Sequence, residues 1–300
     1  MPLTNQQLSI ALQGVLAEPV RELKRTPWSY RSSFPIEELE AVVQDRPLRL
    51  LFKDLSAPRT KPAFVLDPAR EIAAYLEVLG PGAVDAPACY GATSDPAALF
   101  LEVVEGDVLW QVGELQAWEQ AARWLADLHG RGLEDRAARL LRHDAAYFRA
   151  WLPRARAFAP AGSLEGLAPA YERVVQRLAS WPVSFVHGEF YPSNVLIQGR
   201  RIRPVDWEMA GVGPGLLDLA ALSSGGWDEE SREGLARAYF EACSPALRGS
   251  GWDDFLDALE HCRLHLAVQW LGWSADWSPP AEHAYDWLGE ALRLAERVGL

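Results

Sequence analysis

The sequence predicts an α+β protein with a sheet-rich N-terminal lobe and a longer, helical C-terminal lobe. Before residue 106, short apolar runs bounded by turn residues read as strands. After it, apolar residues recur mostly at helical spacing, most clearly over residues 113–130. The chain has 300 residues, too many for one small domain. We therefore expect an N-terminal lobe over residues 1–106 and a C-terminal lobe over residues 107–300.

The N-terminal elements follow from local signals. Residues 3–17 have helical periodicity after a capping residue, Thr4 or Asn5. Residues 21–33 contain Pro27 and several serines, which predict a loop. The remaining order describes a small antiparallel sheet with one helix. Its expected elements are strands over 37–45 and 47–55, an irregular stretch over 56–66, a helix over 67–80 that opens with Asp-Pro, and strands over 87–93 and 97–106.

The C-terminal part reads as helices, with one exception. Short apolar runs at 184–187, 194–197 and 202–207 are separated by polar turns, which is typical of short strands that carry a loop between them. The expected helices cover 113–130, 136–159 and 163–180, and then 214–223, 228–242, 252–272 and 280–297.

Composition narrows the class of partner. The net charge is −12 and the isoelectric point about 5.0, which argues against a nucleic-acid or anionic-membrane surface. This charge is compatible with a cationic partner, although it also serves solubility alone. The three cysteines lack metal-site spacing, and no apolar run approaches the length of a membrane span. We expect a cytoplasmic protein.

The segment FVHGEFYPSNVLI, followed by PVDWE, concentrates groups suited to phosphate chemistry. Asn194 directly precedes one apolar run, and Asp206 directly follows another. Adjacent strands would bring both to one edge, where their hard oxygen atoms suit Mg²⁺. Glu189 lies on the loop before Asn194 and could orient a hydroxyl instead. Phosphoryl transfer needs this division of labour, since positioning and charge neutralisation dominate its catalysis.

The N-terminal lobe offers a matching cation. Lys53 lies on an expected strand with apolar neighbours, and Glu71 follows eighteen residues later in the first turns of a helix. Lys53 is either an outward-facing edge residue or a phosphate ligand. A strand lysine paired with a helix glutamate is the arrangement that directs a lysine toward nucleotide phosphates.

These motifs resemble those of the aminoglycoside phosphotransferase and choline kinase family. That family carries HGDxxxxN and a hydrophobic-Asp-aromatic motif, where this chain has HGExxxxN and VDW. Four further segments match segments of that family: LADLHG at 125–130, PG at 214–215 with DLA at 218–220, AREIAAYLEVL at 69–79, and FLEVVEG at 100–106. The resemblance spans roughly residues 20–225 and implies a bilobal protein-kinase-like fold. The protein-kinase motifs HRD, DFG and APE are absent from the sequence.

The resemblance assigns roles on the nucleotide side. It implies that Lys53 contacts the nucleotide phosphates and that Glu71 holds Lys53. It implies that the backbone of Glu102 and Val104 faces the adenine edge. The loop over residues 28–33 would cover the phosphates. Its contributing residues are Ser32 and Ser33.

The resemblance also assigns the chemistry of the motif segment. Asn194 and Asp206 would bind Mg²⁺, and Glu189 would occupy the place of the catalytic aspartate. His187 would brace the loop by bonding backbone near Asp206. Asp218 would anchor the metal loop as structural support.

Glu189 is the departure from the family pattern. Glutamate keeps the charge but extends the carboxylate by one methylene, and a misplacement near 1 Å costs on the order of 100-fold in rate. The loop could shift to absorb the extra length and leave an active kinase. The enzyme could instead be slow, or it could bind nucleotide without transferring phosphate.

Other patterns have competing interpretations. Trp270, Trp273 and Trp277 recur at helical spacing, so core packing is the first explanation and an aromatic wall for the acceptor is the second. His261 and His265 favour packed histidines over zinc. Residues 211–215 favour a turn over a dinucleotide-binding loop. The acids at 228–230 and 253–257 favour solvated helix faces over an amine site.

Taken together, the sequence predicts a small-molecule kinase that uses ATP or GTP with Mg²⁺. The expected acceptor is a hydroxyl on an aminoglycoside-, sugar- or amino-alcohol-like compound. The alternative is a nucleotide-binding regulatory protein that transfers little phosphate because of Glu189.

Overall fold

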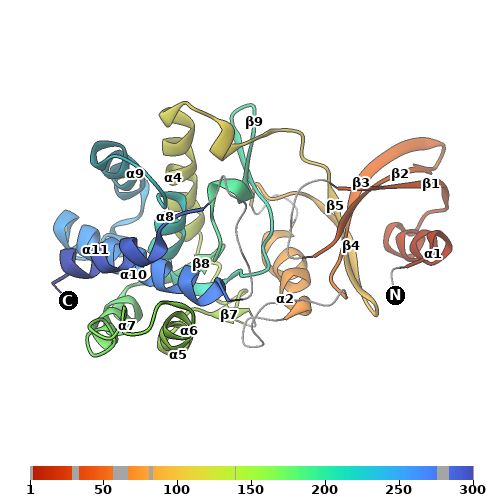
Figure 1. The fold of residues 1–300 in the computed structure, drawn as a ribbon. Helices are drawn as coiled ribbons and strands as arrows, with labels where there is room; N and C mark the ends of the chain where they lie inside the picture. The colour runs from red at the N-terminus through yellow and green to blue at the C-terminus, as the bar shows by residue number, and fades with distance from the viewer. Residues whose placement is uncertain are drawn as a thin grey trace.

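The computed structural model describes residues 3–28, 34–56, 67–80, 84–138, 140–275 and 284–299. Figure 1 shows a sheet with its helices at one end of the molecule and a larger helical body at the other. The N-terminus lies beside the sheet, and the C-terminus lies at the far end of the helical body. The α+β class predicted from the sequence is confirmed.

The N-terminal sheet has five antiparallel strands among the described residues, in the order β1-β2-β3-β5-β4. The loop predicted over 21–33 is wrong for its first part, because Val20–Pro27 pairs along β2. A proline is tolerated there because β1 is an edge strand and Pro27 is its last residue. The strands are β1 (Val20–Pro27), β2 (Ile36–Val43), β3 (Arg46–Asp54), β4 (Cys89–Ser94) and β5 (Ala97–Glu102).

Helices cover both faces of this sheet. α1 (Asn5–Leu16), capped by Thr4 in a capping box, packs on the outer face, and α2 (Pro68–Ala73) lies between the sheet and the helical body (Figure 1). α2 continues as a π-helical segment, η1 (Ala74–Leu79), which completes the predicted helix over 67–80. Phe52 belongs to the core beneath α1. Its neighbour Lys53 therefore points to the inner face, toward α2.

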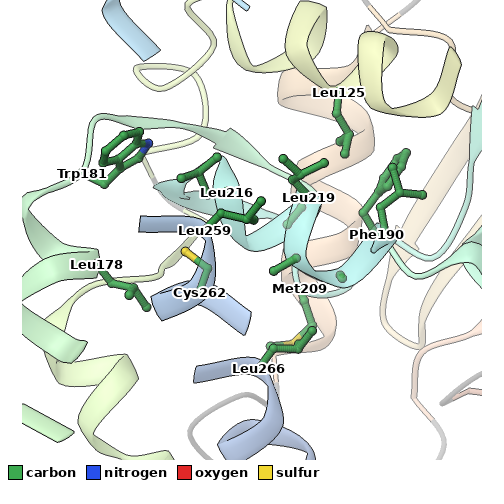
Figure 2. Close-up of a cluster of buried hydrophobic side chains, with 14 of the residues drawn as sticks. Leu125, Leu178, Trp181, Phe190, Met209, Leu216, Leu219, Leu259, Cys262 and Leu266 are labelled. Carbon is green, nitrogen blue, oxygen red and sulfur yellow. The ribbon is translucent and has the colours of Figure 1, made fainter. Parts of the chain in front are cut away.

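The helical body packs around α10, which is buried along most of its length. Figure 2 shows Leu259, Cys262 and Leu266 of α10 in the same apolar cluster as side chains from α7 and α8. The described helices are η2 (Leu109–Gln111), α4 (Leu115–His129), α5 (Ala145–Arg149), α6 (Trp151–Phe158), α7 (Tyr171–Ser180), α8 (Leu216–Leu222), α9 (Glu229–Ala242), η4 (Pro245–Leu247), α10 (Trp252–Trp273) and α11 (Trp287–Arg297).

Two small sheets join this body to the motif segment. β6 pairs with β9 and β9 with β10, while the central β11 pairs with β7 and β8. β5 ends at Glu102, and β6, the next strand along the chain, pairs with β9 in the first of these sheets. The strands are β6 (Asp107–Val108), β7 (Leu141–Arg142), β8 (Val183–Val186), β9 (Val195–Gln198), β10 (Arg201–Pro204) and β11 (Gly211–Pro214); the 3-10 turn η3 (Pro192–Asn194) precedes β9.

Three sequence expectations are wrong in this region. The segment 136–159 is not one helical stretch, because β7 interrupts it, and 163–180 is α-helical only from Tyr171. Residues 211–214 form a buried strand rather than a turn. The glycines make this possible: a β-carbon on Gly211 would lie 2.1 Å from the carbonyl oxygen of Leu141 on the neighbouring strand.

Cys89, Cys243 and Cys262 are free thiols. Within the residues that the structure describes, no helix combines the length and apolar character needed to cross a membrane.

Two buried histidines link stability to pH. His265 of α10 is fully buried and bonds the hydroxyl of Tyr171 at 2.6 Å. Burial, with a contribution from His143, lowers the pKa of His265 to about 3. Burial likewise lowers the pKa of His143 to about 4. Both rings are therefore neutral in the folded protein at pH values where an unfolded histidine binds a proton.

We expect the free energy of unfolding to fall as the pH drops below about 6.5, by about 1.4 kcal/mol per pH unit for each of these histidines. The stability is present above the unfolded pKa and is lost on acidification, because the unfolded state then binds more protons. Urea unfolding at several pH values between 7 and 5 measures the slope. His265→Gln should reduce the slope by the share of one histidine; an unchanged slope would contradict this assignment.

Candidate active site

The β9–β10 hairpin brings Asn194 and Asp206 together. Val195 pairs with Pro204 in this hairpin, and the amide of Val205 donates to the carbonyl of Asn194 at 2.9 Å. Asn194 ends the turn before β9 and Asp206 follows β10, so both side chains leave the same end of the hairpin, as their sequence positions predicted. Asp206 has a φ of +65°, a left-handed conformation that disfavours non-glycine residues.

Lys53 connects this edge to the N-terminal lobe. Its ammonium lies 2.8 Å from the carboxylate of Glu71 on α2 and 2.5 Å from that of Asp206. The lysine is only 2% exposed. Burial favours the neutral amine, but the two carboxylates outweigh it and raise the pKa of Lys53, which keeps the side chain charged. The structure thus brings Lys53, Glu71 and Asp206 into one buried ion cluster.

Asp218 holds the start of the motif loop at His187 and Gly188. Its buried carboxylate accepts the backbone amides of His187 at 2.7 Å and Gly188 at 2.8 Å. His129 lies 3.1 Å from the same carboxylate and contacts Tyr239 through its other ring nitrogen. Burial opposes ionisation of Asp218, yet these hydrogen bonds lower its pKa below the ordinary value. Asp218 therefore anchors the loop that leads to Glu189 and Asn194.

Two further contacts fix the path of this loop. His187 is buried and its Nε2 lies 3.0 Å from the carbonyl of Val205, so the hydrogen bond predicted for it is present. Gly188 has a φ of +84°, and a β-carbon there would lie 2.2 Å from the carbonyl of Met209. Only glycine fits this position.

The charge of Glu189 acts on two tyrosines. Burial first, and then the negative charge of Glu189, raises the pKa of the phenols of Tyr147 and Tyr191. Its carbonyl accepts the amide of Tyr191 at 2.7 Å and Nδ2 of Asn194 at 3.0 Å. That second bond turns Oδ1 of Asn194 to the opposite side of its amide group. The backbone of Glu189 thus fixes the orientation of the Asn194 side chain.

Asn194 and Asp206 suit Mg²⁺ in the chemistry of their donors. Both present hard oxygen atoms from one hairpin end, and Mg²⁺ usually takes one or two protein oxygens together with phosphate oxygens and water. No cluster of three or more His, Cys, Asp or Glu side chains able to hold a metal occurs among the residues that the structure describes. His261 contacts the carbonyl of Asp257 at 2.8 Å, and His265 bonds Tyr171.

The residues expected near a nucleotide base lie at the junction of the lobes. The amide of Glu102 donates to the carbonyl of Ala88 at 2.8 Å, so this amide is already engaged within the protein. Its carboxylate accepts the amide of Ala88 and Nη2 of Arg203, at 2.9 and 2.5 Å. Val104 follows just after β5 and is half-buried. Ser32 and Ser33 lie outside the described residues.

The tryptophans of α10 divide between two roles. Trp273 is buried and packs against Trp151 with ring centroids 4.8 Å apart, which is core packing. Trp270 is half-buried and lies 5.1 Å from the ring of Tyr191 on the motif loop. Trp287 stacks on Trp270 at 5.2 Å. Trp277 lies outside the described residues.

The acid clusters support the helical body. Asp228 caps α9 through the amide of Ser231. Asp254 and Asp257 both pair with Arg177. These three acids therefore have structural roles, one as a helix cap and two as partners of Arg177.

Sequence reasoning missed two buried side chains around Asp206. Arg70 donates to the carbonyl of Glu208 at 3.0 Å, and His143 contacts the carbonyl of Met209 at 3.0 Å. The available signal for Arg70 was a charge next to Glu71 in an otherwise apolar helix segment. His143 had no local signal, because its partner lies 66 residues away.

Comparison with known proteins identifies the class. Residues 38–254 match the profile of the phosphotransferase enzyme family, and the chain therefore belongs to this family. Among curated proteins, a search found no significant match.

Solved structures share the fold at low sequence identity. The choline kinase LicA from Streptococcus pneumoniae superimposes with a TM-score of 0.68 at 15% identity, covering 98% of each chain. A protein assigned as a fructosamine-3-kinase from Thermobifida fusca gives 0.66 at 18% identity, covering 98% of this chain and 100% of its own. A spectinomycin phosphotransferase, solved with ADP and spectinomycin, gives 0.54 at 12% identity, covering 98% and 95%. The chain has the bilobal protein-kinase-like fold of these proteins.

Replacing Asp218 with asparagine should destabilise the protein by about 3 kcal/mol or more, because a buried charge that accepts two backbone amides is lost. Chemical unfolding at neutral pH measures the change. Asp228→Asn is the matched control: it is an exposed helix cap, where asparagine serves as well as aspartate, so the change should stay below about 0.5 kcal/mol. A loss at Asp218 no larger than the control would contradict the anchoring role.

Proposed function

We propose that this protein is a small-molecule kinase that transfers the γ-phosphate of ATP or GTP to a hydroxyl group. The observation that carries the proposal is the buried Lys53, bonded to Glu71 in one lobe and to Asp206 in the other. Family membership supports the class of reaction. The acceptor is proposed to be aminoglycoside-, sugar- or amino-alcohol-like, since the structurally similar proteins include a choline kinase and a spectinomycin phosphotransferase.

The nucleotide side of the mechanism uses the ion cluster. Lys53 binds phosphate oxygens of the nucleotide, and Glu71 holds its ammonium in place. Asn194 and Asp206 would hold Mg²⁺, which would neutralise charge on the phosphates. The Glu102 carbonyl and the Val104 backbone face the base. Ser32 and Ser33 are proposed to cover the phosphates.

Glu189 acts on the acceptor side. Its carboxylate accepts the proton of the acceptor hydroxyl as that oxygen forms a bond to the γ-phosphorus. The bond between the γ-phosphorus and the bridging oxygen breaks, and the nucleoside diphosphate leaves with that electron pair. The position of Glu189 on the loop between the Asp218 anchor and Asn194 supports this role.

The aromatic side chains beside the motif loop are proposed to form the acceptor wall. Tyr191, Trp270 and Trp287 make successive ring contacts, and Tyr285 adds another at 4.8 Å from Trp287. All four are half-buried. Aromatic faces next to a carboxylate favour a ring-containing or cationic acceptor, through stacking or cation–π attraction.

Incubation with Mg²⁺ and ATP or GTP, with a panel of amino alcohols, aminoglycosides and sugars, should yield a phosphorylated product. Asp206→Asn should lower the transfer rate by about 100- to 1000-fold, because metal positioning is lost. Asp85→Asn is the matched control, since Asp85 makes an exposed ion pair with Arg201. Thermal stabilisation by nucleotide without turnover on any acceptor would favour a regulatory nucleotide-binding protein. Absence of binding by both nucleotides would refute the kinase proposal.

Glu189→Asp should lower the transfer rate by about 10- to 100-fold. Aspartate has the shorter side chain, and the loop backbone is held in place, so the carboxylate would no longer reach the acceptor hydroxyl. Glu189→Gln should lower it further, since an amide cannot accept the proton. Steady-state rates with one acceptor at saturating nucleotide measure both. A faster aspartate variant would show instead that the glutamate is misplaced.

A further inference from the structure

The segment that carries Asp206, residues 205–209, is held by its backbone carbonyls. Three of them each meet a buried nitrogen-bearing side chain at the same distance. The contacts are His187 Nε2 with the Val205 carbonyl, Arg70 Nη1 with the Glu208 carbonyl, and His143 Nε2 with the Met209 carbonyl, each at 3.0 Å. Of these three side chains, only Arg70 comes from the N-terminal lobe.

Arg70 and Glu71 are consecutive on α2 and both are buried, with 7% and 1% exposure. Glu71 bonds Lys53, whereas Arg70 crosses to the Glu208 carbonyl and lies 3.9 Å from the sulfur of Met209. One turn of helix therefore fixes both the lysine and the backbone next to Asp206. Any shift of α2 relative to the helical body would disturb both contacts at once.

The contact matters most when a nucleotide is bound, a step that rests on the proposed function. Lys53 must then turn to the phosphates and Asp206 to Mg²⁺, so the ion pair between them, now 2.5 Å long, has to open. Opening of that pair removes a direct contact between Lys53 and segment 205–209. The Arg70 bond goes to a backbone carbonyl two residues from Asp206, and it does not compete for either ligand.

The strain at Asp206 adds a reason for such support. Its left-handed φ of +65° is unfavourable for aspartate and persists only when the surroundings enforce it. Without the Arg70 bond, the segment would be held only from the C-terminal lobe among these three contacts. It could then relax away from α2 and move the carboxylate relative to Lys53.

We propose that Arg70 is a positioning residue. It keeps segment 205–209 in register with α2, so that Asp206 meets the metal at the geometry set by Lys53 and Glu71. Arginine suits this task because its guanidinium stays charged when buried and donates in a fixed plane.

The test compares Arg70→Met and Arg70→Lys with Arg136→Met. Arg136 is the matched control, because its Nε donates to the carbonyl of Glu77 at 2.9 Å, on the continuation of the same helix but away from Asp206. Calorimetric titration with ADP at several Mg²⁺ concentrations is the first readout. Arg70→Met should weaken the Mg²⁺-dependent affinity by about 10- to 100-fold, as for other residues that orient metal ligands. Arg70→Lys should recover part of it, and Arg136→Met should stay within about twofold of the wild type.

Amide hydrogen exchange of residues 205–210 without nucleotide is the second readout. Arg70→Met should speed this exchange by about tenfold or more relative to the wild type, while Arg136→Met should not. Equal exchange and equal Mg²⁺ dependence in Arg70→Met and wild type would overturn the proposal. If wild-type protein binds no nucleotide, the proposed function fails, and the exchange result alone decides whether Arg70 positions the segment. Should Arg70→Met not fold, Arg70→Lys supplies both readouts.

Discussion

The structure depends on the buried positive charge of Lys53. A buried ammonium without partners is costly, and removing one partner of a buried pair is strongly destabilising. The two carboxylates that compensate it come from different lobes, Glu71 from α2 and Asp206 from the segment after β10. Separation of the lobes would therefore break the pair between Lys53 and Asp206 and leave Lys53 with Glu71 alone. The contacts of Arg70, His143 and His187 with segment 205–209 help to place one of these two carboxylates, that of Asp206.

A second ionic contact sets the other side of the junction. Arg203 of β10 is 2% exposed, and its guanidinium bonds the carboxylate of Glu102 and the carbonyl of Ala86 at 3.2 Å. Glu102 ends the last strand of the N-terminal sheet before the chain crosses between lobes. Glu102 and the lysine cluster are thus both contacted from β10 or just after it, by Arg203 and Asp206.

The sequence predicted those parts of the site that depend on local pattern. The apolar runs around Asn194 and Asp206 predicted a shared edge, and the spacing of Lys53 and Glu71 predicted a strand–helix pair. It did not predict β1, whose charged residues become a strand only by pairing with β2. It missed Arg70 because its partner, Glu208, lies 138 residues away. Contacts of that kind are set by packing of the two lobes, which no local periodicity records.

Glu189 is the residue to which the proposed mechanism assigns the proton of the acceptor hydroxyl. The loop that carries it is fixed by the amide bonds to Asp218, by the fit of Gly188 against Met209, and by the two bonds to the Glu189 carbonyl. The main chain therefore has little freedom to retreat and absorb a longer side chain. In the proposed mechanism, the extra methylene, about 1.5 Å of reach, is instead matched by the position of the acceptor hydroxyl. An acceptor held by the rings of Tyr191 and Trp270, rather than directly against the loop, would meet that requirement.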